Sequence, residues 1–334
     1  MGDIMTIFLN ILFLVIGMIL LIKGADYFVG GASAVAKKLK VPALFIGLTI
    51  VSIGTSFPEL SVSISSAISN SPDLSVGNMI GSNLANMFLI LGLMALIAPV
   101  PIKATMKKIE LPFLIAITTI MMLFSLDMFL DGAEANMLSR VESILFLIMI
   151  ILYLAILIFN ARKTRNSHIQ ANSTEEQKHE KELKIWQIVV YVIVGLAAVI
   201  FGGECVSSTA KFLALEMGMS EALVGLTIVA IGTSLPELVT SVIAARKGEN
   251  DIAIGNIVGS NIMNISLVLG VVGTISQINI SATILTDMII LLVFTIVAIV
   301  CCIRKSDISK REGILFLIMY FAYIAFAVIR NYCF

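Results

Sequence analysis

The sequence predicts an all-α polytopic membrane protein with ten transmembrane helices, arranged as two inverted five-helix repeats with broken helices. Three observations support this fold class. Of the 334 residues, 59% are hydrophobic and only 13% are charged, whereas soluble domains are about 45–50% apolar and about 25% charged. The apolar residues gather in long runs, and two stretches of the chain repeat each other.

The apolar runs are long enough to be membrane spans. A helix needs about 20 apolar residues to cross a hydrocarbon core of about 30 Å. Each run is rich in Ile, Leu, Val and Met, without the short alternating strands of a barrel. The first run follows Met-Gly-Asp without a basic segment, so we expect a retained span and not a signal peptide. The ten predicted spans are 5–23, 42–68, 73–97, 111–129, 141–160, 185–210, 220–245, 251–275, 283–303 and 312–330.

The basic residues predict how these spans are oriented. Alternate loops hold 18 of the 22 Lys and Arg residues, and the other side has only Arg140, Lys211 and Arg330. Basic loops face the cytoplasm, so both termini are expected outside and the polar segment 161–184 inside. This split also favours an even number of spans.

Composition excludes several other classes of protein. The 22 basic and 22 acidic residues balance, which leaves no basic surface for nucleic acid. The four cysteines form neither a disulfide framework nor a zinc pattern. Both histidines, His168 and His179, lie in segment 161–184, so a histidine metal site in the apolar body is not expected. We expect this segment to be a solvated linker that divides the spans five and five.

The repeat is the most informative feature. Gly47–Glu59 matches Gly225–Glu237, and Gly77–Asn86 matches Gly255–Asn264, with a constant offset of 178. Across the first motif region, 24 of 46 positions are identical to their partners. The shared residues include Gly, Thr, Ser, Pro, Glu and Asn, which chance similarity of apolar helices would not produce. The predicted units are 1–160 with motif region 47–92, the linker 161–184, and 185–334 with motif region 225–270.

Five spans per half is an odd number, so the second half enters the membrane from the opposite face. Inverted repeats of this kind are common among secondary transporters. The motifs fall within the second and third spans of each half, so we expect four motif helices to meet near the membrane midplane.

Glu59 and Glu237 lie in the middle of otherwise uncharged spans. A carboxylate at that depth is costly and is normally protonated, paired or bound to a cation. No Lys or Arg lies mid-span to pair with it. The proline before each glutamate removes a helical hydrogen bond near Gly54 or Gly232, and the freed carbonyls can line an ion cavity.

Further oxygen donors lie close to the glutamates in sequence. Because residues four apart share a helix face, the two Ser–Asn pairs of the partner spans each present both side chains to one side. A set made only of oxygens suits Ca²⁺ and Na⁺, and two ions competing for shared ligands can produce exchange. The glycine, serine and asparagine residues also suit close helix packing. Asp26, Glu204 and Asp287, near span ends, are expected at the interface. The donors are Thr55, Ser56, Ser82, Asn86, Thr233, Ser234, Ser260 and Asn264.

At these motifs the chain resembles the sodium/calcium exchanger family of the cation/Ca²⁺ antiporter superfamily. Gly54–Glu59 with Gly77–Asn83 resembles the first α-repeat of that family, and Gly232–Glu237 with Gly255–Asn261 resembles the second. The resemblance implies antiport of cytoplasmic Ca²⁺ against entering Na⁺ by alternating access. It also implies that the first and sixth spans are the moving pair.

The resemblance assigns roles to residues. Glu59 and Glu237 would be shared ligands of Ca²⁺ and Na⁺, and the backbone carbonyls of Thr55 and Thr233 would complete the Ca²⁺ site. The flanking Na⁺ sites would use the carbonyls of Ser52 and Ala230 and the side chains of Ser56, Ser82, Asn86, Ser234, Ser260 and Asn264.

Some alternatives remain open at this point. Some relatives, including K⁺-dependent exchangers, have Asp where this chain has Asn264, so K⁺-independent transport is expected. H⁺/Ca²⁺ antiport is the second hypothesis because a glutamate can exchange protons, and a cation channel or an intramembrane hydrolase is more remote. We expect no cofactor and no obligate protein partner besides the transported ions and the bilayer. The plasma membrane is the expected location.

Overall fold

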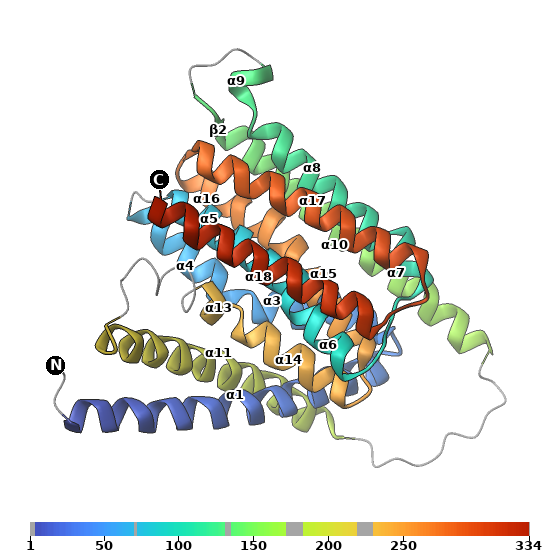
Figure 1. Ribbon diagram of the computed structural model, residues 1–334. Helices are drawn as coiled ribbons and strands as arrows, with labels where there is room; N and C mark the ends of the chain where they lie inside the picture. The colour runs from blue at the N-terminus through green and yellow to red at the C-terminus, as the bar shows by residue number, and fades with distance from the viewer. Residues whose placement is uncertain (1–3, 70–71, 131–134, 172–182, 219–229, 334) are drawn as a thin grey trace.

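The computed structural model describes residues 4–69, 72–130, 135–171, 183–218 and 230–333. Within these ranges the chain is helical apart from short connections and four two-residue strands, which confirms the all-α prediction. Figure 1 shows the helices packed in one bundle, with α1 and α11 side by side along one edge.

The first half alternates long helices with short interrupted ones. Its elements are α1 (Ile4–Leu39), α2 (Ala43–Ile46), π-helical η1 (Gly47–Val51), α3 (Ser52–Thr55), α4 (Phe57–Ile68), α5 (Pro72–Leu84), π-helical η2 (Ala85–Ile90), α6 (Leu91–Ile97), β1 (Val100–Pro101), α7 (Ala104–Lys108), α8 (Glu110–Phe124), α9 (Asp127–Leu130), β2 (Met137–Leu138) and α10 (Arg140–Ala171).

The second half follows the same order over the residues described. Its elements are α11 (Ile185–Glu216), α13 (Ala230–Thr233), α14 (Leu235–Arg246), α15 (Asn250–Met263), π-helical η4 (Asn264–Val268), α16 (Leu269–Ile275), β3 (Ile278–Asn279), α17 (Ala282–Arg304), β4 (Asp307–Ile308) and α18 (Lys310–Cys333).

The described part of the chain contains fewer long apolar helices than the ten spans predicted. In the described part of the chain, seven helices are long and apolar enough to cross a membrane, and the bent pair Ala43–Thr55 and Phe57–Ile68 is an eighth candidate. The predicted span 111–129 is not among them because α8 has only 15 residues. The predicted span 220–245 begins in 219–229, which lies outside the described residues.

Several helices extend beyond their predicted spans. The predicted span 5–23 continues as α1 to Leu39, and span 141–160 continues as α10 to Ala171, which includes His168. Hydropathy marks where the apolar face ends, but backbone hydrogen bonding continues until a residue leaves the helical conformation, as Lys40 does after α1 with a φ of 55°. The linker 161–184 is therefore partly helical, and His179 lies outside the described residues.

The pair α1 and α11 is held together by unusually close backbone contact. A Cβ atom on Gly24 would lie 2.7 Å from Ala198 Cβ, and one on Gly202 would lie 2.5 Å from the backbone nitrogen of Leu21. Glycine lets two helices approach this closely. At about 1.5 Å per residue, the 36-residue α1 is about 54 Å long. It therefore exceeds the apolar thickness of a bilayer and must tilt to remain in it.

Two small antiparallel sheets connect the halves. β1 pairs with β4, and β2 pairs with β3, so each sheet takes one strand from each half. β1 and β3 are separated by the repeat offset of 178. The 23-residue α17 runs from β3 to β4 and so places the sheets at opposite ends of the bundle. We call these ends the β1–β4 end and the β2–β3 end.

The two spans that carry the Gly-Asn-x-x-Gly-Ser-Asn motifs form the centre of the bundle. In Asn250–Ile275, 94% of the most apolar 18-residue segment is buried inside the protein, and in Leu74–Ile97 the share is 72%. The corresponding share for α1 is 11%. The motif helices are thus surrounded by other helices, whereas α1 lies on the periphery.

Candidate functional site

Two helices are interrupted directly before a glutamate. The chain passes from α3 to α4 at Ser56 and from α13 to α14 at Ser234. The φ/ψ angles of these serines are −82°/4° and −90°/6°, so neither continues the helix. Pro58 and Pro236 follow in the first turn of the new helix, where a missing N–H is tolerated. The axes on either side of Ser56 differ by 43°.

A buried glutamate follows each break. Glu59 is 1% exposed and Glu237 is 0% exposed. Ser82 donates a hydrogen bond of 3.4 Å to Glu59 Oε1, and Ser260 donates one of 3.4 Å to Glu237 Oε1. The second oxygen, Oε2, of each glutamate has no hydrogen-bond partner in the described structure. A buried carboxylate with a free oxygen needs a proton or a cation.

Hydroxyl groups connect the two carboxylates across the halves. Ser56 of the first half donates a hydrogen bond of 3.2 Å to Glu237 Oε1. Ser234 of the second half donates one of 3.0 Å to the hydroxyl oxygen of Ser82, which in turn donates to Glu59. The two breaks and the two glutamates therefore form a single polar cluster.

The threonines at the breaks are anchored by the opposite half. Thr55 Oγ1 donates to Asn256 Oδ1 at 3.0 Å, and Thr233 Oγ1 donates to Asn78 Oδ1 at 3.2 Å. These two contacts are equivalent under the 178-residue offset. Because each threonine is the last residue of its short helix, its carbonyl lies beside the break.

Ser52 and Ala230 occupy equivalent positions one turn before the threonines. Ser52 is fully buried, and its hydroxyl donates to the carbonyl of Thr49 at 3.3 Å. Thr55 Oγ1 makes a long contact of 3.4 Å with the Ser52 carbonyl. Ala230 begins α13, and its side chain lies outside the described residues.

Asn86 and Asn264 lie one turn beyond Ser82 and Ser260, at π-helical turns. Such turns are frequent at functional sites. Both amides are fully buried. Neither amide atom of Asn86 has a partner, whereas Asn264 Nδ2 donates to Asn83 Oδ1 at 3.2 Å and only its Oδ1 is unpartnered.

Sequence reasoning left Asn83 and its equivalent Asn261 out of the candidate ligand set. Both are 1% exposed, and Asn261 Nδ2 donates to the Asn83 carbonyl at 3.3 Å. Their identity in both motifs, within Gly-Ser-Asn, was the signal that could have identified them.

The unpartnered atoms show what the cluster can bind. Glu59 and Glu237 each leave one carboxylate oxygen free, and Asn86 and Asn264 each leave an amide oxygen free. These candidate ligand atoms are all oxygens, which suits hard cations. Among the described residues, no group of three or more His, Cys, Asp and Glu side chains could hold a metal. The charged side chains described in this cluster are those of Glu59 and Glu237.

The acidic residues near span ends lie apart from this cluster. Asp26 of α1 pairs with Lys247, whose Nζ is 2.8 Å from Asp26 Oδ1 and 2.6 Å from its carbonyl oxygen. Asp287 accepts two hydrogen bonds of 2.9 Å from Arg330. Glu204 is exposed on α11.

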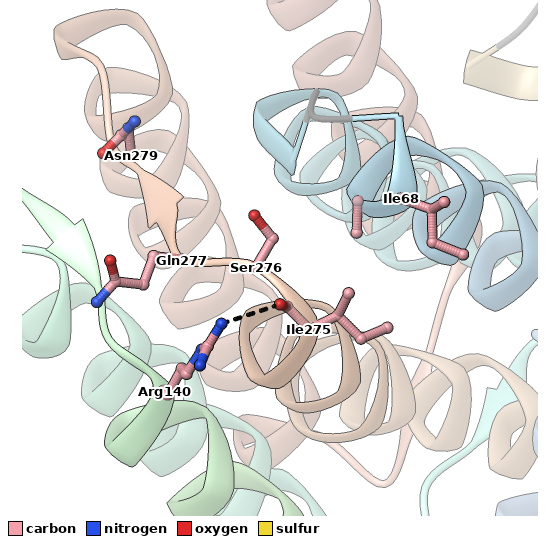
Figure 2. Close-up of a pocket in the computed structure, with 7 residues that line it drawn as sticks. Ile68, Arg140, Ile275, Ser276, Gln277 and Asn279 are labelled. Carbon is pink, nitrogen blue, oxygen red and sulfur yellow. Dashed lines mark hydrogen bonds between the residues drawn. The ribbon is translucent and has the colours of Figure 1, made fainter.

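A separate cavity of about 700 Å³ lies at the β2–β3 end, and neither glutamate lines it. Figure 2 shows its lining side chains, among which Arg140 Nη2 donates to the Ile275 carbonyl at 3.4 Å. Ala67 and Ile68, at the end of α4, also line it. The cavity therefore lies about two turns beyond Glu59 along α4.

Comparisons with known proteins agree with this arrangement. The family described as "Sodium/calcium exchanger protein" matches residues 9–159 and 187–329. The chain is 36% identical over 321 residues to the putative antiporter CaxA of Alkalimonas amylolytica, which covers 93% of this chain and 96% of that protein. It is 32% identical over 343 residues to the sodium/calcium exchanger MaX1 of Methanosarcina acetivorans, with 94% and 97% covered.

The fold also matches a solved structure. The sodium-calcium exchanger NCX_Mj superposes with a TM-score of 0.79 at 30% sequence identity, and the match covers 95% of this chain and 98% of that one. These relatives are thus named as exchangers or as an antiporter.

Proposed function

Since the chain belongs to the sodium/calcium exchanger family, we propose that it is a secondary active antiporter that exchanges Na⁺ for Ca²⁺ by alternating access. One observation carries the proposal. Glu59 and Glu237 are buried in one cluster, each at a helix break and each with an unpartnered oxygen. Together they supply at most two negative charges, which one Ca²⁺ neutralises and which Na⁺ can replace.

The proposed ligands follow the geometry of the cluster. Glu59 and Glu237 bind both ions, and the carbonyls of Thr55 and Thr233 complete the Ca²⁺ site. Threonine anchoring by the opposite half supports this role, because it fixes the direction of the chain at each break. The proposed Na⁺ ligands are the carbonyls of Ser52 and Ala230 and the side chains of Ser56, Ser82, Asn86, Ser234, Ser260 and Asn264.

We further propose ten spans in two inverted repeats, 1–160 and 185–334, joined by the linker 161–184. Contacts that recur under the 178-residue offset support this architecture: the two Ser–Glu bonds and the two Thr–Asn bonds. The two antiparallel sheets, each with one strand from each half, also support it. Helices α8 and α14, which are shorter than the other candidates, would supply the two remaining spans. The basic loops support cytoplasmic placement of the linker and an outside location of both termini, in the plasma membrane.

The moving pair in this proposal is α1 and α11. Their close contact through glycine supports movement as one body, because the two backbones leave little space for independent motion. Their peripheral position supports sliding over a buried centre that keeps its contacts.

Na⁺ coupling without K⁺ is proposed from the amides. Asn86 and Asn264 supply neutral oxygens, so the cluster lacks the third carboxylate found in K⁺-dependent relatives. Proton coupling is the second candidate function, and the two carboxylates favour it since their free oxygens can take protons.

Uptake of Ca²⁺ into proteoliposomes loaded with Na⁺ tests the proposal. We expect uptake that requires internal Na⁺, does not require K⁺ and is lost in Glu59→Gln. Glu110→Gln is a matched control, because Glu110 is also buried with an unpartnered oxygen but lies in α8. Uptake driven by a pH gradient without Na⁺ would replace the proposal with H⁺/Ca²⁺ antiport, and uptake without any counter-ion would indicate a channel.

A further inference from the structure

Three buried side chains form a hydrogen-bonded row between the halves. Asn264 Nδ2 donates to Asn83 Oδ1 at 3.2 Å, and Asn83 Nδ2 donates to Met79 Sδ at 3.4 Å. Asn264 is 0% exposed, and Asn83 and Met79 are each 1% exposed. We call Met79, Asn83 and Asn264 the amide relay.

The chemistry of the relay gives it one direction. A thioether sulfur can only accept a hydrogen bond, so the end of Asn83 that faces Met79 is its amino group. The carbonyl end of Asn83 then faces Asn264 and requires a donor there. Asn264 must therefore turn its own amino group toward Asn83, and its Oδ1 remains free.

The free oxygen belongs to the helix face that carries the site. Asn264 follows Ser260 by four residues, and Ser260 donates to Glu237. Asn264 Oδ1 is buried without a partner in the described structure. An unpartnered carbonyl oxygen in such a place is costly unless a cation binds it.

The other half has no such relay. The residue equivalent to Met79 is Ile257, which has no acceptor, and Asn261 donates to the backbone of Asn83 and not to a side chain. Asn86, the equivalent of Asn264, has no partner at either amide atom. The orientation of Asn86 is therefore not set by a neighbouring amide, whereas that of Asn264 is.

We propose that the amide relay orients Asn264 so that its neutral oxygen, and not its amino group, faces a bound monovalent cation. Asn83 is thus a positioning residue for a Na⁺ site and does not itself bind the ion. This inference rests on the proposed function, because it concerns the Na⁺ dependence of exchange. The affinity for Ca²⁺ is expected to depend little on the relay, because the proposed Ca²⁺ ligands are the glutamates and the threonine carbonyls.

Na⁺-dependent Ca²⁺ uptake of purified variants in proteoliposomes tests the relay. Asn83→Leu should raise the Na⁺ concentration for half-maximal uptake roughly two- to ten-fold, as for the loss of one hydrogen bond, and leave the KM for Ca²⁺ within about two-fold. Met79→Leu, which keeps the core volume, should shift the Na⁺ dependence in the same direction but less. Ser125→Ala removes one buried hydrogen bond at the end of α8, outside the relay, so it is the matched control and should leave the Na⁺ dependence unchanged.

A double-mutant cycle separates orientation from a general structural effect. In the Asn264→Ala background there is no amide to orient, so Asn83→Leu should add no further shift. An equal shift in both backgrounds, or unchanged Na⁺ dependence in both Asn83→Leu and Met79→Leu, would overturn the relay and leave the proposed function intact. Wild-type vesicles without Na⁺-dependent uptake would overturn the proposed function and with it this inference.

Discussion

The two halves of the candidate site have the same residues but not the same contacts. Glu237 accepts hydrogen bonds of 3.2 and 3.4 Å from Ser56 and Ser260, and Glu59 accepts one of 3.4 Å from Ser82. The equivalent of Ser56 is Ser234, which donates to Ser82.

The amides and hydroxyls around the glutamates differ in the same direction. Asn256 donates to Ser241 at 2.9 Å. In the first half the equivalent atoms, Asn78 Nδ2 and Ser63 Oγ, are both without a partner. Identical residues at a constant offset thus make different hydrogen bonds around Glu237 and around Glu59, although each glutamate keeps one unpartnered oxygen. We therefore expect equivalent substitutions in the two halves to have different effects.

The largest effect is expected from removing either charge. Glu59→Gln and Glu237→Gln should each lower Ca²⁺ binding by roughly 100-fold or more, since loss of one buried charged partner costs about 3–5 kcal/mol. Stabilisation of the protein by Ca²⁺ in thermal unfolding measures this, because a bound ion raises the unfolding temperature. Normal stabilisation of one variant would show that a single carboxylate suffices, and the paired site would be wrong.

The serines at the two breaks should differ. Ser56→Ala removes a hydrogen bond to the Glu237 carboxylate, and bonds to charged groups contribute about 1.5–3 kcal/mol, or roughly 10- to 100-fold in affinity. Ser234→Ala removes a bond to a hydroxyl and should cost about 1 kcal/mol. Titration of Ca²⁺-dependent uptake for both variants compares them. Equal losses would mean that the difference between the halves has no functional consequence.

Replacing Ser241 and replacing its equivalent Ser63 should lower the stability of the protein by different amounts. Ser241→Ala leaves the buried amino group of Asn256 without a partner and should lower the free energy of unfolding by about 1–3 kcal/mol. Ser63→Ala removes a hydroxyl that bonds to nothing, so its effect should be near zero. Thermal unfolding in detergent, without added ions, gives both values. A Ser63→Ala variant that is as destabilised as Ser241→Ala would contradict the comparison.

The smallest effect is expected at the β1–β4 end. Lys247 joins the α14–α15 turn to Asp26 of α1, but the equivalent pair, Ser69 and Glu204, has no basic residue. The partners are largely exposed, so Lys247→Ala should cost about 0–1 kcal/mol. Unfolding in low and high salt measures it, because screening weakens such a pair. A loss that is independent of salt would indicate packing and not charge.

Much of the fold could be predicted from the sequence because its causes are local. The apolar runs predicted membrane helices, and the 178-residue offset identified Glu59 and Glu237 as a pair. The Gly-Thr-Ser-x-Pro pattern predicted interruptions near Gly54 and Gly232, which the structure has at Ser56 and Ser234. A mid-span carboxylate is costly wherever its helix packs, so its importance did not depend on knowing its neighbours. Helix ends were less predictable. Hydropathy reports contact with lipid, whereas backbone hydrogen bonding decides where a helix ends, so α1 continues beyond its predicted span to Leu39.

Only the tertiary structure decided which oxygens are satisfied. Whether Ser56 reaches Glu237 or Glu59, and whether Asn264 but not Asn86 is oriented by a neighbour, depends on side chains far apart in sequence that meet across the halves. A hydrogen bond requires distances of about 3 Å, so small differences in helix packing make or remove it. By itself, the sequence determined which residue types recur in the two motifs and which of them correspond to each other. The packing of one half against the other determined how they differ.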